Sequence, residues 1–372
     1  MFAQSIRLGR ILGIPIGMNY TWFIVFVLIS LSLSTQFADQ NPSWSYAEHL
    51  VFGIVTSLLF FASILLHELG HSVLALRYGI PVQAITLFVF GGVAQISREP
   101  DKPSQEFFIA IAGPIVSAVL GVLFFGVKLL SEGSFEGLVS LGAWLARINI
   151  AVALFNLIPG FPLDGGRILR SIAWRISGSF EKATVIAAGC GQFFAYVFIF
   201  FGIWIALSGN FFNGLWIGFI GWFLLNAAQM STVQTRLKHA LKGIVARDVM
   251  TQECLRLPGN LSVEEVVENH MLRTGTRCAL VVDGERMRGL VTLHEIKTVP
   301  KEDWSRTSLQ AVMIPPERLQ SVSTKTPVSE VLQFMRDHNI SQLPVVEDGK
   351  LVGLIGRDHL LALLHTRLEV KV

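Results

Sequence analysis

Six apolar stretches of about twenty residues fill the first 230 positions and constrain what this chain can fold into. A helix rises about 1.5 Å per residue, so each stretch can cross a hydrocarbon core of about 30 Å. The stretches are Gly17–Ser34, His49–Ala75, Gln105–Val127, Leu138–Pro159, Ala183–Leu207 and Phe211–Met230. The sequence therefore predicts a multi-pass α-helical membrane domain.

Charge is distributed unevenly along the chain. Hydrophobic residues make up 52% of the sequence and charged residues only 15%, yet 36 of the 57 charged residues follow Thr232. A soluble region must therefore follow the membrane domain. We predict a six-span domain over residues 1–235, a linker over 236–245, and two repeated motifs over 246–303 and 308–372.

The basic residues between the spans predict the orientation in the membrane. Twelve lysines and arginines lie in segments on one side, whereas Lys128 alone lies on the other. Because cytosolic segments are enriched in these residues, both termini and the soluble tail are expected in the cytosol, at the plasma membrane if the cell is prokaryotic. The net charge of +3 and the lack of an arginine-rich run argue against a nucleic-acid partner.

A His-Glu-x-x-His motif lies inside the second span. On a helix His67 and His71 share one face, which is the spacing at which two imidazoles bind one zinc ion, and Glu68 can act on a metal-bound water. Placing an ionisable side chain at membrane depth costs free energy, so a residue of this kind found there usually has a function. The sequence therefore predicts a zinc site within the membrane, nearer its cytosolic face.

A short apolar segment follows the second span. The β-prone runs Ile85–Phe90 and Val93–Ile96 are joined by Gly91-Gly92, which predicts a hairpin. Non-helical backbone at membrane depth must be satisfied by protein or by a wet cavity, so this hairpin is expected to line the catalytic chamber, where its free edge could pair with an extended peptide. The alternative is an interfacial loop that does not contact substrate.

A catalytic zinc ion needs about three protein ligands, so a third must come from elsewhere. Asp164 is a candidate because it follows the fourth span in a segment whose prolines and glycines end the helix. These residues would allow the carboxylate to turn toward the histidines, although they also form ordinary interfacial turns.

The two motifs together resemble a known family. His67-Glu68-Leu69-Gly70-His71, followed by Asn156, Pro159 and Pro162-Leu163-Asp164-Gly165, is similar to the site-2 protease family of intramembrane zinc metalloproteases, in its CBS-domain-containing branch. The resemblance implies one zinc ion per chain with His67, His71 and Asp164 as ligands. It also implies Glu68 as general base and Asn156 as a polar group near the substrate carbonyl.

The resemblance further implies the reaction and its partners. The expected activity is regulated intramembrane proteolysis, in which a water molecule activated by zinc and Glu68 attacks a peptide bond in a single-span membrane protein. The catalytic core is expected in the second to fourth spans, with the outer helices gating lateral entry from the lipid bilayer. A helical substrate must be unwound first, because its peptide bonds are hydrogen-bonded and shielded.

The tail contains an internal repeat. Short apolar strands and amphipathic helices between 248 and 292 recur between 311 and 356 at an offset of about 63 to 66 residues. A sustained period of this kind predicts a duplicated α+β unit whose copies pack on each other. Each copy resembles a CBS motif, and the pair is expected to form a homodimer contact.

CBS pairs often bind adenine nucleotides through a Ser or Thr and an Asp three residues later. The first copy offers Thr292 and Glu295, while the second has Gly356 and His359, with Asp358 one place early. Nucleotide binding and a purely structural role therefore both remain open. For the whole chain the alternatives to a protease are a CBS-gated transporter or channel and a non-catalytic adaptor that binds membrane helices.

Overall fold

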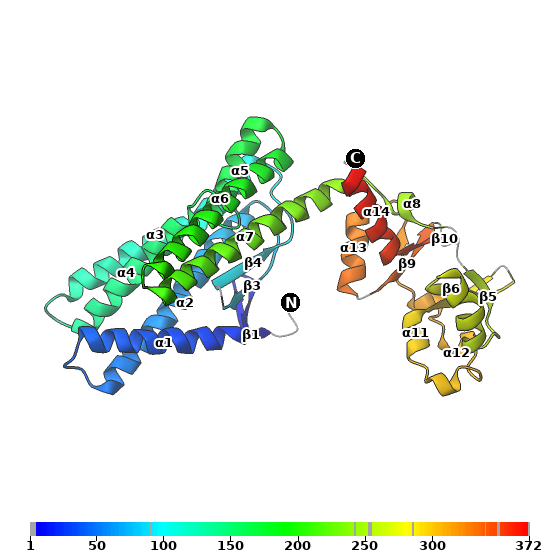
Figure 1. Cartoon of the computed structure of the whole chain (residues 1–372), viewed down its shortest axis with the longest axis horizontal. Helices are drawn as coiled ribbons and strands as arrows, with labels where there is room; N and C mark the ends of the chain where they lie inside the picture. The colour runs from blue at the N-terminus through cyan, green and yellow to red at the C-terminus, as the bar shows by residue number, and fades with distance from the viewer. Residues whose placement is uncertain are drawn as a thin grey trace. The chain divides into compact units, whose positions relative to one another are not determined.

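The structure is a computed structural model of the chain. It describes residues 5–89, 91–241, 243–251, 255–284, 286–338, 340–347 and 350–370. The chain divides into two compact units, residues 1–233 and 234–372, and each is described by itself (Figure 1).

Within the described residues of the first unit, six helices are long and apolar enough to cross a membrane, which confirms the predicted number. They are α1 (Thr21–Gln40), α2 (Tyr46–Arg77), α3 (Pro103–Ser131), α4 (Glu136–Asn156), α6 (Phe180–Leu207) and α7 (Phe211–Ala240). Helix α2 begins with a capping box in which the Ser45 N–H donates to Glu48 at 2.7 Å and the Glu48 N–H donates to Ser45 Oγ at 3.3 Å.

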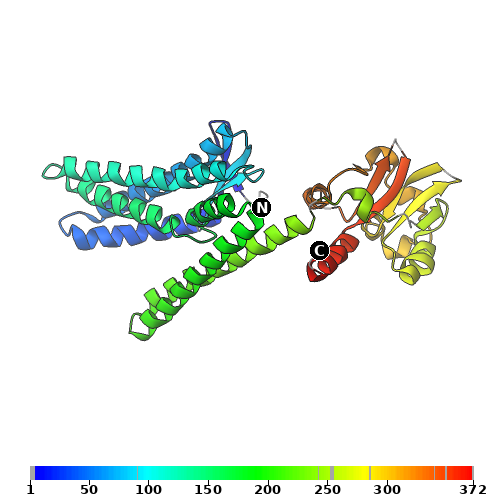
Figure 2. The same ribbon diagram turned by 90° about the horizontal axis from the view of Figure 1, so that it is seen from above.

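Small residues set the distances between these helices. An added Cβ at Gly53 of α2 would lie 2.6 Å from the Ser30 carbonyl of α1, and one at Gly142 of α4 would lie 2.9 Å from the Phe124 carbonyl of α3. Glycine allows such close approach of two backbones, as is typical of helices packed in a membrane. Helices α6 and α7 form a pair that is inclined to α1–α4 in Figure 2.

A four-stranded sheet lies beside α2. Its order is β1 (Ser5–Ile11), β2 (Ile14–Asn19), β3 (Val82–Phe88) and β4 (Gly91–Ile96), with β2 and β3 parallel and the other pairs antiparallel. Ile14, Ile16 and Ile85 pack with Leu69 of α2 in one buried cluster. The sheet therefore covers the part of α2 that carries the His-Glu-x-x-His motif.

The sheet corrects two sequence expectations. The first span does not begin at Gly17 but at Thr21, because residues 14–19 pair as β2. Gly91 and Gly92 do not form the hairpin turn, because they pair with Phe88 and Leu87 inside β4. Phe90, the predicted end of the first run, lies outside the described residues.

The loop after α4 leads into a further helix that the sequence analysis did not predict. Helix α5 (Asp164–Ser177) begins at the predicted zinc ligand and ends at Gly178, whose φ of 67° is the left-handed conformation favoured by glycine. The fourth span also ends earlier than expected, at Asn156 instead of Pro159. The segment of prolines and glycines is thus a connection between two helices.

The second unit contains two copies of one supersecondary pattern, as the repeat predicts. The first copy has α8 (Ala246–Val249), β5 (Leu255–Pro258), β6 (Cys278–Asp283), β7 (Arg286–Thr292) and α11 (Leu293–Lys297). The second has α12 (Leu309–Val312), β8 (Val322–Ser323), β9 (Gln342–Glu347), β10 (Lys350–Gly356) and α14 (Arg357–Val370). Strands β6 and β9 begin 64 residues apart.

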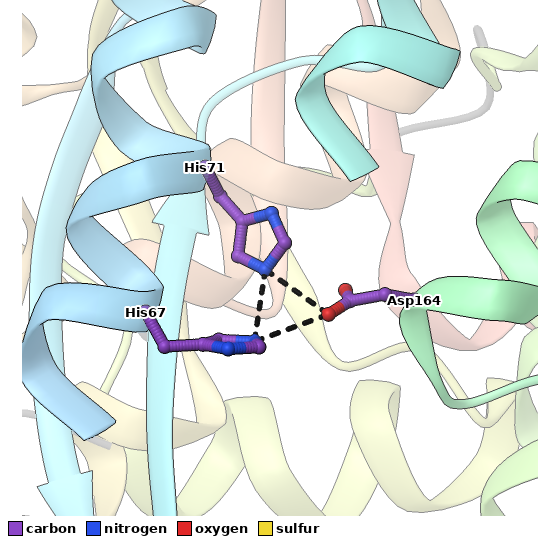
Figure 3. A group of neighbouring side chains, drawn as sticks. All are labelled: His67, His71 and Asp164. Atoms are coloured by element: carbon purple, nitrogen blue, oxygen red, sulfur yellow. Dashed lines mark hydrogen bonds and ion pairs between the residues drawn. The ribbon is translucent and has the colours of Figure 1, made fainter. Parts of the chain in front are cut away.

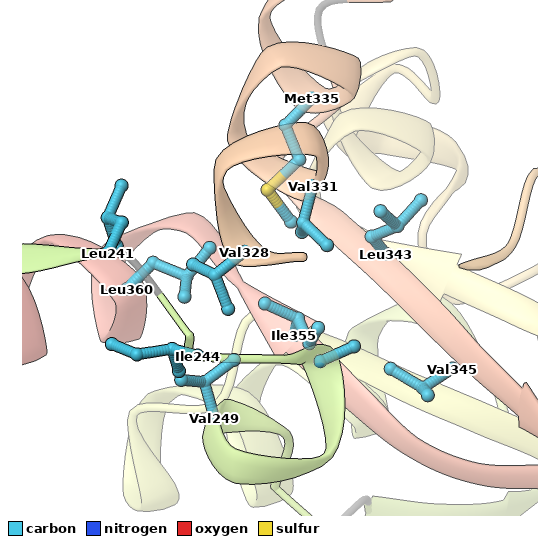
Figure 4. Packing of buried hydrophobic residues seen from close by; sticks show 11 residues of the cluster. Leu241, Ile244, Val249, Val328, Val331, Met335, Leu343, Val345, Ile355 and Leu360 are labelled. Carbon is cyan, nitrogen blue, oxygen red and sulfur yellow. The ribbon is translucent and has the colours of Figure 1, made fainter. Parts of the chain in front are cut away.

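The two copies exchange backbone contacts symmetrically. Thr251, which follows α8, bridges to Leu354 of the second copy, and Ile314, which follows α12, bridges to Leu290 of the first. The tail has two cores, and in each one the short helix assigned to one copy packs with the strands of the other: α8 with the second copy and α12 with the first. Figure 4 shows the cluster around α13 (Val328–Asp337), in which Val331, Met335 and Leu343 are fully buried. The predicted fold class, a six-span helical domain followed by a tandem α+β pair, is confirmed.

Candidate metal centre

Three side chains from two distant helices meet inside the first unit. His67 and His71 extend from α2, and Asp164 extends from the first residue of α5 (Figure 3). Asp164 Oδ2 lies 3.1 Å from His67 Nε2 and 3.2 Å from His71 Nε2, while the two Nε2 atoms lie 3.3 Å apart. The structure thus brings together the three residues predicted as zinc ligands.

Helix α3 orients both imidazoles through their outer nitrogens. His71 Nδ1 lies 2.7 Å from the Ile109 carbonyl oxygen, and His67 Nδ1 lies 2.9 Å from Ser117 Oγ. A carbonyl can only accept, so the His71 proton lies on Nδ1 in the neutral ring and the lone pair of Nε2 faces Asp164. A backbone carbonyl that accepts from the outer nitrogen, as at His71, is typical of metal-ligating histidines.

The donor atoms fit a zinc ion by their spacing and by their chemistry. Ligands placed tetrahedrally at about 2.0–2.1 Å from zinc lie about 3.3 Å from one another, close to the separations of 3.1, 3.2 and 3.3 Å between the three donor atoms. Two imidazole nitrogens and a carboxylate oxygen facing one another are mutually repulsive unless a cation or a proton lies between them. The cluster is buried, with His67 5% and His71 4% exposed.

Gly113 of α3 leaves the space beside the donor atoms open. A Cβ built at Gly113 would lie 2.3 Å from His71 Nε2 and 2.6 Å from His67 Nε2. The side chain of any larger residue at position 113 would therefore press against the two Nε2 atoms on the side where a metal ion would bind. From the sequence, Gly113-Pro114 is only a kink or a close-packing position. How closely it approaches α2 depends on the tertiary structure.

Two glycines hold Asp164 in place by letting α5 pack on the loop that precedes it. A Cβ at Gly165 would lie 2.3 Å from the Ile158 carbonyl oxygen, and one at Gly166 would lie 2.4 Å from the Gly160 carbonyl carbon. Burial acts to raise the pKa of Asp164, but an adjacent imidazole that carries a proton on Nε2 attracts and hydrogen-bonds the carboxylate and holds that pKa well below its usual range. The carboxylate is therefore available as an anionic ligand.

Glu68 lies beside the cluster and contacts the sheet. Its Oε2 accepts a hydrogen bond from the Ala94 N–H of β4 at 3.2 Å. Strand β4 can approach because residue 92 is glycine, where a Cβ would lie 2.6 Å from Glu68 Cγ. Gly92 therefore serves close approach, which is why it lies within a strand and not in a turn.

Asn156, predicted near the substrate carbonyl, is the last residue of α4. Its Nδ2 donates to the Val152 carbonyl at 3.0 Å, within its own helix. A second asparagine of α4, which the sequence analysis did not single out, is more deeply buried. Asn149 is 2% exposed and donates to the Leu145 carbonyl at 2.9 Å and to Ser63 Oγ at 3.4 Å, one turn before His67 on α2.

The three residues considered for nucleotide binding have partners within the tail. Thr292 caps α11, its Oγ1 donating to Glu295 Oε2 at 2.5 Å and its N–H donating to the same oxygen at 3.0 Å. Asp358 of the second copy forms an ion pair with Arg277 of the first at 2.5 Å. A capping box and an exposed ion pair thus involve all three residues.

Comparison with known proteins relates both units to described families. A family model described as peptidase family M50 matches residues 55–135 and 131–201, and a CBS-domain model matches residues 246–302 and 310–366. A zinc metalloprotease of Methanocaldococcus jannaschii is 32% identical over 370 residues, covering 99% of each chain.

Two further similarities cover much of the chain. A protein of Synechocystis sp., whose name assigns it provisionally to the zinc metalloproteases, is 36% identical over 368 residues, which are 98% of this chain and 96% of that protein. The solved structure of a site-2 protease from Methanocaldococcus jannaschii is 35% identical, covers 61% of this chain and 95% of its own, and has a TM-score of 0.44.

Proposed function

The chain belongs to peptidase family M50, and from this membership we propose that it cleaves peptide bonds within the transmembrane segments of single-span membrane proteins. It is a membrane zinc metalloprotease of the site-2 protease type. The observation that carries the proposal is the meeting of His67, His71 and Asp164 beside Glu68, because this set can hold a metal next to a carboxylate base.

Each side chain then has a chemical role. His67, His71 and Asp164 hold the ion, which when bound lowers the pKa of water and polarises the scissile carbonyl. Glu68 takes the proton from the attacking water and delivers it to the leaving amine nitrogen. Asn156 supports the oxyanion in this proposal, which requires its amide to leave the Val152 carbonyl when substrate binds.

We also propose that the substrate pairs with β4 in extended form. Strand β4 is an edge of the sheet. Its Ala94 N–H donates to Glu68 of α2, so this amide points to the side of β4 that faces the carboxylate. A peptide added along that side would pass the carboxylate of Glu68, with its backbone extended and accessible to water.

The sequence supports a cytosolic location for both termini and for the tail, because the positively charged segments lie on that side. The CBS pair would then modulate activity from the cytosol and join two chains into a dimer. If the pair binds an adenine nucleotide, adding AMP to the full chain should change the cleavage rate and protect the tail against thermal unfolding. Absence of both effects would favour a purely structural role.

The test of the proposed activity uses the purified full chain in lipid vesicles with a single-span reporter protein. We expect cleavage within the reporter's span, loss of cleavage after chelation, and recovery on adding zinc. Glu68→Gln should abolish cleavage while retaining about one zinc ion per chain. The matched control is Glu132→Gln, because Glu132 is exposed and pairs only with Lys128 among the described contacts.

Two outcomes would contradict the proposal. Cleavage by Glu68→Gln at the wild-type rate would exclude Glu68 as the base. Cleavage that is unaffected when the purified chain contains no zinc would exclude the metal site. The relatives that match nearly the whole chain carry zinc metalloprotease names, which favours a protease over a transporter or an adaptor.

A further inference from the structure

Arg170 of α5 is a buried cation close to the metal centre, although in the sequence it is only one of the positive charges between the spans. The side chain is 6% exposed, and Nε donates to Glu106 Oε1 of α3 at 2.6 Å. Its Nη2 forms ion pairs with Glu106 and with Glu99, the latter at 3.3 Å. Glu106 is fully buried, so this is an ion pair inside the protein.

Two aromatic rings enclose the guanidinium. Its Cζ lies 4.9 Å from the ring centre of Phe161 and 4.5 Å from that of Phe180. Phe161 belongs to the loop before Asp164, and Phe180 is the first residue of α6. Arg170 therefore contacts α3, α6 and the loop that leads into its own helix.

Among the residues that the structure describes, Arg170 is the cation that bonds directly to Glu106, while Arg167 acts on it only through its charge. Glu106 Oε2 is buried and has no hydrogen-bond partner among the described residues. The carboxylate therefore contacts the positively charged guanidinium of Arg170 through Oε1. A buried carboxylate without a cation is strongly unfavourable. The two side chains are therefore expected to stay together, which fixes the position of α5 along α3.

The ion pair connects the two halves of the donor set. Arg170 lies six residues after Asp164 on the same helix, and Glu106 lies three residues before Ile109, whose carbonyl orients His71. Helix α5 cannot shift along α3 without separating these charges. A shift of a few tenths of an ångström would already change the separations of 3.1 and 3.2 Å between Asp164 and the imidazoles.

We propose that Arg170 is a positioning residue of the metal centre, which acts through Glu106 to hold the Asp164 carboxylate at bonding distance from an ion shared with His67 and His71. The inference rests on the proposed zinc site but not on cleavage of any substrate. It predicts that the pair controls how tightly the ion is held and how it is coordinated, apart from any effect on folding.

The decisive variant replaces both partners, Arg170→Met together with Glu106→Met. Similar-sized apolar side chains at both positions avoid an unpaired buried charge, so the double variant is expected to fold. We expect it to release zinc to a chelator at least about tenfold faster than the wild type, within the range for outer partners of metal ligands. With cobalt in place of zinc, the visible spectrum should report an altered coordination geometry, which a role in folding alone would not change.

Arg170→Lys provides a second variant that keeps the charge but loses the Nε contact and the planar fork. It should fold and release zinc at an intermediate rate. The matched control is Arg98→Met, which breaks an exposed pair with Asp101 near the start of α3 and should leave zinc release and the cobalt spectrum unchanged.

The outcomes separate this inference from the proposed function. If the wild type binds no zinc, the proposed metal site itself is wrong. If the wild type binds zinc, and the folded double variant releases it at the wild-type rate with the wild-type cobalt spectrum, the positioning role is wrong. Should the double variant fail to fold, wild-type zinc release by Arg170→Lys would overturn the inference equally.

Discussion

At the scale of single residues, the metal centre depends on two glycines without side chains as much as on its ligands. Gly113 and Gly92 supply no side chain where a Cβ would contact the imidazoles or Glu68. A glycine at a structurally important position is often explained by its backbone freedom. Here both positions require glycine because a neighbouring side chain lies too close for any larger residue. Each position therefore predicts a distinct defect.

Gly113→Ala should abolish zinc binding without replacing a ligand. The added methyl would lie 2.3 Å from His71 Nε2, so the imidazole must turn away from Asp164. We expect the zinc content of the purified chain to fall from about one ion to nearly none. Gly126→Ala is the control on the same helix, because a Cβ there has no atom within 4 Å. Full zinc occupancy in Gly113→Ala would contradict this geometry.

Gly92→Ala should separate metal binding from catalysis. Its methyl would lie 2.6 Å from Glu68 Cγ but is not close to the donor atoms, so either Glu68 or β4 must move. We expect zinc content to remain near one per chain while cleavage of the reporter falls by about a hundredfold, the lower end of what a positioned general base contributes. Gly189→Ala, where a Cβ meets open space, serves as control. A wild-type cleavage rate in Gly92→Ala would show that Glu68 tolerates the displacement.

At the scale of elements, helices provide the rigid parts and the short elements between them decide where the chemistry occurs. The histidines lie on α2, while α3 orients them through Ile109 and Ser117. Asp164 reaches them because α5 begins directly after a loop packed through Gly165 and Gly166. Strand β4 then contacts Glu68 from the other side. The site therefore requires α2, α3, α5 and β4 together.

Replacing a glycine at the contact between α6 and α7 with a larger residue is expected to push the two helices apart. A Cβ at Gly214 of α7 would lie 2.3 Å from the Ala206 backbone nitrogen of α6, whereas one at Gly218 would meet no atom within 4 Å. Gly214→Ala should therefore lower the free energy of unfolding by about 1–3 kcal/mol, the usual effect of overpacking, and Gly218→Ala should leave it unchanged. Thermal unfolding of the purified chain tests this, and equal stability of the two variants would argue against close packing at Gly214.

At the scale of the whole molecule, the chain consists of two units with separate cores. The membrane unit is built around α2, α3 and α4, while the tail has two cores, each with residues of both repeats, and a further cluster of Leu280, Leu290 and Leu354. Because buried contacts hold each unit together internally, we expect the two to unfold in separate transitions.

Met335→Ala should destabilise the tail alone. Met335 is fully buried in the core of the second repeat, so its truncation is expected to lower the stability of the tail by about 2–5 kcal/mol. Scanning calorimetry of the full chain should show one transition shifted to lower temperature, with zinc content unchanged. Leu145→Ala, in the buried part of α4, should shift the other transition. A common shift of both transitions in either variant would indicate that the units unfold together.

Local patterns in the sequence were enough to predict the spans, the His-Glu-x-x-His pair and the tail repeat. Hydrophobic length, a spacing of four residues on a helix and a period near 64 are all properties of neighbouring or regularly spaced positions. The family resemblance added Asp164, whose carboxylate the structure places against both imidazoles. The sequence alone left Asp164 open between a ligand and an ordinary turn.

Tertiary structure decided the features that depend on contacts between distant segments. Strand β2 pairs with β3 across more than sixty residues, so residues 14–19 became a strand although their composition continues into the first span. Gly92, Gly113 and Arg170 look like a turn residue, a kink and a loop cation when read locally. Their partners, Glu68, the imidazoles and Glu106, come from other elements. Side-chain packing between elements determines these roles, and no local pattern of residues encodes which elements will meet.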